Sequence, residues 1–181
     1  MSSQATRIEH DLLGEKAVPA DAYYGVQTAR GLENFHISGV ELRLYPNVIK
    51  AFAMVKLAAA RANFDCGQFS AEILKGMEGA CQELIGGRLH DQFRLDVFQG
   101  GAGTSTNMNT NEVVANRALE LLGLPAGRYD EVHPLDHVNR SQSTNDVYPT
   151  AVKLSLLAAL NGLSTAVHVV AEACKTKSRE F

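Results

Sequence analysis

The sequence has no tryptophan, few cysteines and no cluster of basic residues, and each shortage limits what the protein can be. Its three cysteines, Cys66, Cys81 and Cys174, are widely spaced and odd in number, which indicates reduced thiols rather than a disulfide framework. The 17 Lys and Arg residues are dispersed and are outnumbered by 20 Asp and Glu residues. A binding surface for nucleic acid or for an anionic membrane is therefore not expected.

The amino terminus also lacks a signal peptide, because MSSQATRIEHD contains no apolar core. This absence predicts a cytoplasmic location. The overall composition, 45% hydrophobic and 20% charged over 181 residues, is that of a soluble globular chain with one domain, or one domain and part of another.

Most of the chain has helical patterns. Residues 1–40 are rich in Gly and turn-forming residues and predict an irregular or mixed lobe, with a short helix near residues 25–34. Three longer helices are expected after that lobe. They cover PNVIKAFAMVKLAAARANFD (46–65), AEILKGMEGACQELIGG after the cap Ser70, and TNEVVANRALELLG (110–123), whose buried stripe is Val113, Val114, Ala118, Leu121 and Leu122.

The segment from Thr150 to about Lys175 is apolar on nearly every side. A membrane span is one interpretation, but Asn161, His168 and Glu172 would be costly in lipid, and no basic flank orients the segment. We therefore expect a long helix in the middle of a helical bundle or an oligomer, where every face contacts another helix.

A Gly-rich polar cluster, GGAGTSTN (100–107), directly precedes the expected third helix. It is not a P-loop, because the Gly-Lys-Ser/Thr ending is missing. It is not a dinucleotide fingerprint either, because position 106 is Thr where the third Gly belongs and no strand leads into it. Helix capping needs only one or two of these polar residues, so the surplus indicates a binding role.

A second polar cluster, with Ser141, Ser143, Thr144 and Asn145, stands before the last helix. Hydroxyl and amide groups without Lys or Arg can hold a carboxylate while its charge changes. The pair of clusters thus predicts a substrate whose carboxylate becomes more negative during reaction, as in carbanion chemistry. The alternative is a non-catalytic helical assembly module in which both clusters only cap helices.

His133 and His137 lie four residues apart, a spacing that can place two metal ligands on one helix face. Pro134 disfavours a helix through this stretch, and no third ligand is evident, so a metal site is not expected. A histidine pair in a loop, hydrogen-bonded to the backbone or ordering the neighbouring polar cluster, is the favoured interpretation.

The two polar clusters match a known family. GGAGTSTNMNTNEVVANRALE (100–120) and HPLDHVNRSQSTNDVYPTA (133–151) resemble the aspartase/fumarase superfamily, and EHDLLGEKAVPADAYYGVQTARGLENF (9–35) looks like the opening of the same enzymes. Class II fumarases usually carry Gly-Thr-Gln-Ser-Asn and Gln-Ser-Ser-Asn-Asp at these places. The Thr104-Ser105-Thr106 and Ser143-Thr144 sequences here favour the aspartase branch, with a fumarase or related dicarboxylate lyase as the alternative.

The resemblance implies a mainly α fold, with a mostly helical N-terminal domain over residues 1–140 and the start of a central helix bundle over residues 141–181. It implies a homotetramer whose active sites are shared between subunits. The implied reaction, without an organic cofactor, is the reversible deamination of L-aspartate to fumarate and ammonia through an aci-carboxylate.

The resemblance also assigns roles to individual residues. Ser143 and Thr144 would hold the β-carboxylate, and Thr104 and Asn145 would orient the amino group. His133 and Asp136 map to a second anion site of the family, although Leu135 replaces the usual Asn between them. No metal ligand is implied.

Members of this family are much longer than 181 residues, and their catalytic serine lies on a Gly-Ser-Ser loop in the later half. No such loop occurs in this sequence, and it ends before the Thr-His pair that contributes to substrate binding. We therefore expect the 181-residue polypeptide to supply substrate-binding residues and to be inactive alone.

Overall fold

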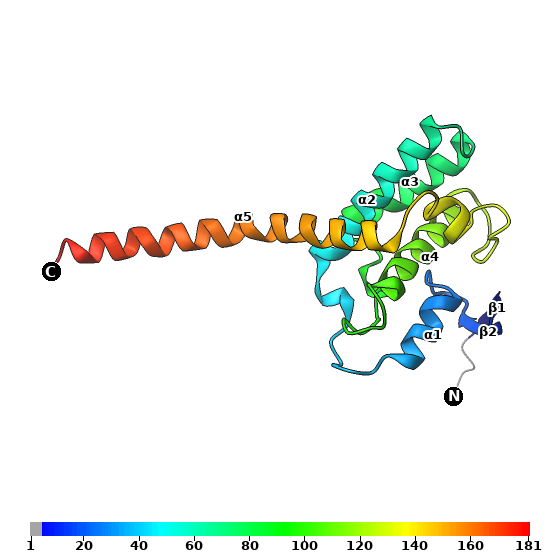
Figure 1. Cartoon of the computed structure of the whole chain (residues 1–181), viewed down its shortest axis with the longest axis horizontal. Helices are drawn as coiled ribbons and strands as arrows, with labels where there is room; N and C mark the ends of the chain where they lie inside the picture. Colours follow the sequence, from blue (N-terminus) through cyan, green and yellow to red (C-terminus); the bar gives the residue numbers. More distant parts are fainter. Residues whose placement is uncertain (1–4) are drawn as a thin grey trace.

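The computed structural model describes residues 5–181, which form a helical body and one helix that projects from it (Figure 1). The protein is mainly helical, as expected. The mixed lobe at the amino terminus is an antiparallel hairpin, in which Thr6 pairs with Pro19 and Asp11 with Gly14. The elements in order are β1 (Thr6–Asp11), β2 (Gly14–Pro19), α1 (Val26–Asn34), η1 (Leu42–Leu44), α2 (Pro46–Asp65), α3 (Ala71–Ile85), η2 (His90–Gln92), α4 (Thr104–Leu121), η3 (Pro134–Val138) and α5 (Thr144–Ser178).

The helices α1, α2 and α3 lie where the sequence predicts them. α2 begins at Pro46, where the missing N–H of proline costs no hydrogen bond. α3 begins after Ser70, whose hydroxyl oxygen accepts the N–H of Ile73 at 3.4 Å. Local start and stop signals in the sequence were sufficient to predict the positions of these three helices.

The prediction for α4 was wrong at both ends. The helix begins at Thr104 rather than Thr110, so the polar residues of the Gly-rich cluster lie inside its first turns. Thr106 and Asn109 are buried there, and Thr110 donates its hydroxyl to the carbonyl of Thr106 at 3.0 Å, which lets polar side chains remain helical. Leu121, expected in the buried stripe, is 42% exposed because the helix ends at this residue.

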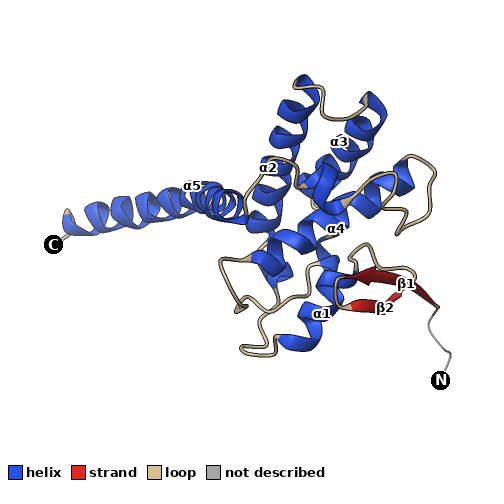
Figure 2. Cartoon of the chain, turned by 45° about the vertical axis from the view of Figure 1, so that its right-hand side comes forward, coloured by secondary structure: helices blue, strands red, loops and turns tan. Residues whose placement is uncertain are grey.

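The core lies between α2, α3 and α4, which pack against one another in both views (Figures 1 and 2). Ile49 and Ala53 of α2, Met77 of α3, and Val113 and Ala118 of α4 share one buried cluster. A second, smaller cluster joins α2 to the beginning of the last helix: its members are Ala51, Phe52, Val147 and Ala151.

The last helix, α5, is longer than predicted and begins at Thr144 instead of Thr150. Pro149 lies inside the helix, in its second turn, where it removes one backbone hydrogen bond without ending the helix. Only the first turns pack on the body, through Val147, Ala151 and Ser155. Figure 1 shows the rest extending away from the body to the carboxyl terminus.

The projecting part of α5 exposes a row of large apolar side chains. By length and composition alone the helix could cross a membrane, since one 18-residue window has a mean hydropathy of 1.6 and is 6% buried. Its exposed apolar residues are Leu154, Leu156, Leu157, Leu160, Leu163, Val167, Val169 and Val170. Within residues 5–181 nothing covers this surface, so a partner surface is needed to remove it from water.

Candidate active site

The Gly-rich loop before α4 adopts a backbone that only glycine accommodates easily. Gly101 has a φ of 69° and Gly103 a φ of 85°, both in the left-handed region. A Cβ atom at Gly103 would lie 2.0 Å from the ring of Tyr148 on α5. The loop thus needs Gly103 for two reasons, its backbone conformation and the close approach of the tyrosine.

The second polar cluster forms the amino-terminal end of α5. Ser143 is the N-cap, and its hydroxyl oxygen accepts the N–H of Asn145 at 3.2 Å. Thr144 and Asn145 lie within the first turn rather than before the helix. Ser141, just ahead, has a φ of 59°, a backbone conformation that costs free energy for a residue with a side chain.

The two clusters meet through Asn107, in the first turns of α4. Its side-chain amide donates to the Thr144 hydroxyl oxygen at 3.3 Å and to the side-chain carbonyl of Asn139 at 3.0 Å. Residues separated by almost forty positions in the chain are therefore neighbours in the fold. Convergence of the clusters, on which the sequence interpretation depended, occurs within one chain.

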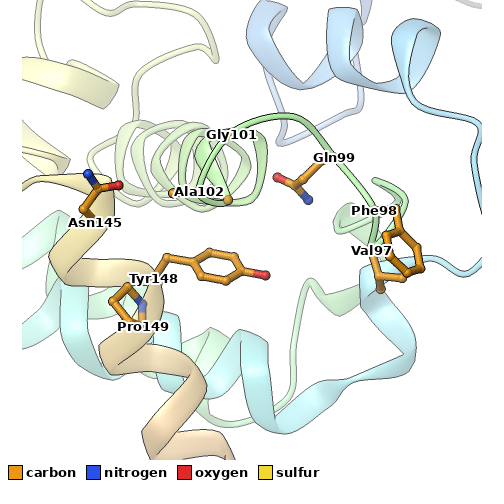
Figure 3. Close-up of a pocket in the computed structure, with 9 residues that line it drawn as sticks. Val97, Phe98, Gln99, Gly101, Ala102, Asn145, Tyr148 and Pro149 are labelled. Carbon is orange, nitrogen blue, oxygen red and sulfur yellow. The ribbon is translucent and has the colours of Figure 1, made fainter.

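A cavity of about 520 Å³ lies between the Gly-rich loop and α5. Figure 3 shows Tyr148 extending into this space, with Asn145 and Pro149 beside it on α5. The lining residues are Val97, Phe98, Gln99, Gly101, Ala102, Gly103, Asn145, Tyr148 and Pro149. No charged side chain is among them, so the donors that this cavity offers are neutral.

The four predicted substrate-binding residues are arranged unequally around this cavity. Asn145 lines it, and Thr144 is half-buried behind it against Asn107. Thr104 and Ser143 are exposed, and among the described residues no hydrogen bond joins one to the other. The structure thus brings Thr144 and Asn145 to the Gly-rich loop and leaves the Thr104 and Ser143 hydroxyls accessible.

Sequence reasoning missed the buried residues that hold the site together. Asn139 accepts hydrogen bonds from Asn107 and Asn111, and from Lys56 at 2.9 Å. Burial lowers the pKa of Lys56 to about 7. The available signal was its position: Ile49, Ala53, Lys56, Ala60 and Asn63 recur at three-to-four spacing on the buried face of α2.

The histidine pair is bound to the backbone, as expected, but the segment is not a loop. Residues 134–138 form one π-helical turn, η3, which starts at Pro134 because proline is tolerated in the first turn. His133 Nδ1 accepts the N–H groups of Leu135 and Asp136, both at 3.1 Å, and His137 Nδ1 accepts the N–H of His133 at 2.9 Å. The pair therefore caps a turn.

His133 lines a second cavity of about 590 Å³, between η3, the β1–β2 hairpin, the start of α1 and the first half of α4. Glu112 lies at its wall, where burial raises the pKa of the carboxyl group to about 7. Three backbone N–H groups, from Gly25, Gln27 and Thr28, donate to the Glu112 carboxylate. Among residues 5–181, no group of three or more His, Cys, Asp or Glu side chains is placed to hold a metal ion.

Known proteins are similar to this chain in sequence and in fold. A family model described as lyase matches residues 14–181. The chain belongs to this lyase family. Aspartate ammonia-lyase of Pseudomonas aeruginosa is 50% identical over 177 residues, 98% of this chain. This chain is therefore a homologue of aspartate ammonia-lyase.

Solved structures agree with the family and the fold. The native crystal structure titled fumarate lyase:delta crystallin from Brucella melitensis superimposes with a TM-score of 0.95 over 98% of this chain, at 54% identity. A recombinant class II fumarase from Schistosoma mansoni matches less closely, with a TM-score of 0.78 over 83% of the chain and 41% identity. The chain spans 37% of the length of the Pseudomonas lyase and 41% of the Brucella chain.

Proposed function

We propose that this segment supplies the carboxylate-binding and amine-binding residues of an aspartate ammonia-lyase, which converts L-aspartate to fumarate and ammonia. The observation that carries the proposal is the Asn107 to Thr144 hydrogen bond, because it joins the two neutral polar clusters at one place. The homology to aspartate ammonia-lyase supports the choice of substrate.

Neutral donors suit the chemistry of this elimination. A base removes a proton from Cβ of aspartate, and the electron pair moves into the adjacent β-carboxylate to give an aci-carboxylate with an additional negative charge. The electrons then return to form the C=C bond as the Cα–N bond breaks and ammonia leaves. Hydroxyl donors from Ser143 and Thr144 would stabilise the β-carboxylate most when its charge is greatest.

Thr104 and Asn145 would orient the amino group of the substrate. A hydroxyl oxygen and an amide oxygen both accept hydrogen bonds from an ammonium group. Asn145 faces the cavity beneath the Gly-rich loop, and Thr104 is exposed where that loop enters α4. Such positioning holds the Cα–N bond in one orientation relative to the Cβ proton.

The catalytic base belongs to a part of the enzyme outside these 181 residues, and no organic cofactor takes part. The active form would be a cytoplasmic homotetramer, in which α5 helices of different subunits cover one another and three subunits contribute to each active site. The uncovered apolar surface of α5 supports this assembly. The 181-residue chain by itself would then have no activity.

We also propose a second anion site at His133 and Asp136. Because His133 Nδ1 accepts two backbone N–H groups, the neutral ring carries its proton on Nε2 and can donate it. The Asp136 carboxylate lies 3.4 Å from His133 Nδ1, so it is on the side of the ring opposite Nε2, where the anion would bind. Titration of the His133→Ala variant with succinate tests the site, since an unchanged stoichiometry would remove it from the proposal.

Steady-state rates test the main proposal. The complete polypeptide that carries this segment should release fumarate from L-aspartate far faster than from malate or argininosuccinate. A preference for malate would favour the alternative, a class II fumarase, to which the Schistosoma structure is similar. Failure to bind succinate or aspartate in calorimetry would favour the non-catalytic assembly module.

A further inference from the structure

Lys56 is a buried amine with no acidic partner. It lies on α2, has no exposed surface, and donates from Nζ to Asn139 Oδ1 at 2.9 Å and to Gln142 Oε1 at 3.0 Å. Among residues 5–181, no ion pair includes it. A buried ammonium without a counter-ion is costly, so a lysine at this position calls for a reason beyond packing.

The two amides that Lys56 contacts determine the shape of the loop ahead of Ser143. Asn139 Nδ2 donates to the Gln142 carbonyl at 3.1 Å, and Gln142 Nε2 donates to the Val138 carbonyl at 2.8 Å. The same loop contains Ser141 in its left-handed conformation. Lys56 therefore holds both side chains that keep this strained loop closed.

The contacts of Lys56 continue to Thr144 through a shared oxygen. Asn139 Oδ1 accepts three donors: Lys56 Nζ at 2.9 Å, Asn107 Nδ2 at 3.0 Å and Asn111 Nδ2 at 3.3 Å. Asn107 Nδ2 in turn reaches the Thr144 hydroxyl oxygen. Three hydrogen bonds thus connect the amine to a hydroxyl proposed to bind the substrate carboxylate.

We propose that Lys56 is a positioning residue for the Ser143 and Thr144 pair, and that its amine takes up a proton when a dicarboxylate binds there. This inference rests on the proposed function, because it takes that pair as the carboxylate site. This role explains how a site lined by neutral donors tolerates the growing negative charge of a carboxylate. The compensating positive charge is the Lys56 ammonium, which lies behind the hydroxyl groups and does not contact the substrate.

The surroundings of Lys56 suit this behaviour. Burial lowers its pKa to about 7, and the titratable group that faces it is Cys81 of α3, whose own pKa burial raises to about 12. From the 138–143 loop Lys56 faces the uncharged amides of Asn139 and Gln142, and the α4 residue Asn107 donates to the same Asn139 oxygen. Near neutral pH part of the amine is unprotonated, and a nearby carboxylate raises its pKa, so proton uptake follows.

Calorimetric titration of the complete polypeptide with succinate tests the proton uptake. At about pH 7.5, in two buffers of different ionisation enthalpy, wild type should take up a substantial fraction of a proton per site. Lys56→Met should lose this uptake and bind about tenfold or more weakly, and Lys56→Arg should lose the uptake but bind more tightly than Lys56→Met. Lys50→Met on the same helix is the control and should match wild type.

Two further measurements are needed. Hydrogen exchange distinguishes a positioning role of Lys56 from a general role in stability, and an activity assay tests the proposed reaction separately. Amides of residues 138–146 should exchange with deuterium faster in Lys56→Met, while those of α3 stay protected. Wild-type proton uptake retained in Lys56→Arg, or unchanged exchange in Lys56→Met, would overturn the proposal. If wild type makes no fumarate from aspartate, the reaction fails, while the exchange result still decides whether Lys56 positions the loop.

Discussion

The side-chain amide of Asn107 donates to the hydroxyl oxygen of Thr144 at 3.3 Å, joining the first turns of α4 to the first turn of α5. The same amide donates to Asn139 at 3.0 Å. One buried asparagine therefore aligns the ends of two helices. Hydroxyl groups next to this junction project from rigid helix ends, which suits precise binding of a small ligand.

Thr144→Val should impair catalysis without changing the assembly. Valine has nearly the same shape but cannot donate to a carboxylate, so kcat/KM of the complete polypeptide for aspartate should fall by about 10²–10³-fold. Thr150→Val, also on α5, is the control, because the Thr150 hydroxyl donates only to the Asp146 carbonyl. Steady-state rates and light scattering measure both effects, and equal kcat/KM in the two variants would contradict the role of Thr144.

Helix boundaries were predictable from sequence only where local signals determine them. Pro46 and Ser70 mark the starts of α2 and α3, and both predictions were confirmed. The start of α4 was predicted wrongly because Thr and Asn normally favour helix caps and turns rather than helix interiors. Its first turns instead bury these side chains against the rest of the fold, where tertiary contacts override local preference.

The sequence named candidate residues for the site but not the buried residues that support them. The two polar clusters and the family resemblance together pointed to Thr104, Ser143, Thr144 and Asn145, and their roles in binding stay a prediction. Lys56, by contrast, contacts Asn139 and Gln142 more than eighty residues away in the chain. A single sequence does not encode such long-range pairing in any local pattern, beyond placing Lys56 on the buried face of α2.

Gly103→Ala should displace the Gly-rich loop from Tyr148. The added Cβ would lie 2.0 Å from the tyrosine ring and would also force a side chain to adopt a φ of 85°. Gly123→Ala separates these causes, since Gly123 has a φ of 76° with nothing within 4 Å of the added Cβ. We expect both variants to lose thermal stability and only Gly103→Ala to lose most of its kcat/KM.

Restoring space beside the loop provides the complementary test. Adding Tyr148→Ala to Gly103→Ala removes the clash, but it also removes the packing of Tyr148 on Phe52. The Tm lost by the double variant should therefore be smaller than the sum of the losses of the two single variants. Losses that simply add would show that backbone conformation accounts for the effect of Gly103→Ala.

Glu112 should make stability depend on pH. Its pKa rises from 4.5 to about 7 on folding, so its favourable contribution is complete below about pH 4.5 and is lost as the pH rises through 7. The loss is at most roughly 3 kcal/mol. Glu112→Gln has no ionisable group at this position and should flatten Tm between about pH 5 and 8.

The control for Glu112 is the exposed Glu72→Gln on α3, which should leave the pH slope unchanged. Glu112→Gln should also lower Tm at every pH, because its amide group faces backbone N–H donors of α1 that the carboxylate accepts. An unchanged slope in Glu112→Gln would mean that the buried carboxyl group stays ionised across this range.

Leu157→Glu should break the proposed assembly of α5. Leu157 is 60% exposed here, and burying a glutamate among the helices of other subunits would be strongly unfavourable. Light scattering of the complete polypeptide should show a tetramer for wild type and smaller species for the variant. Leu12→Glu, at the exposed tip of the β1–β2 hairpin, receives the same charge and should remain tetrameric. Two outcomes would contradict the proposed α5 bundle: wild type that can be purified only with membranes, or a tetramer formed by Leu157→Glu. In either case α5 would have another means of covering its apolar surface.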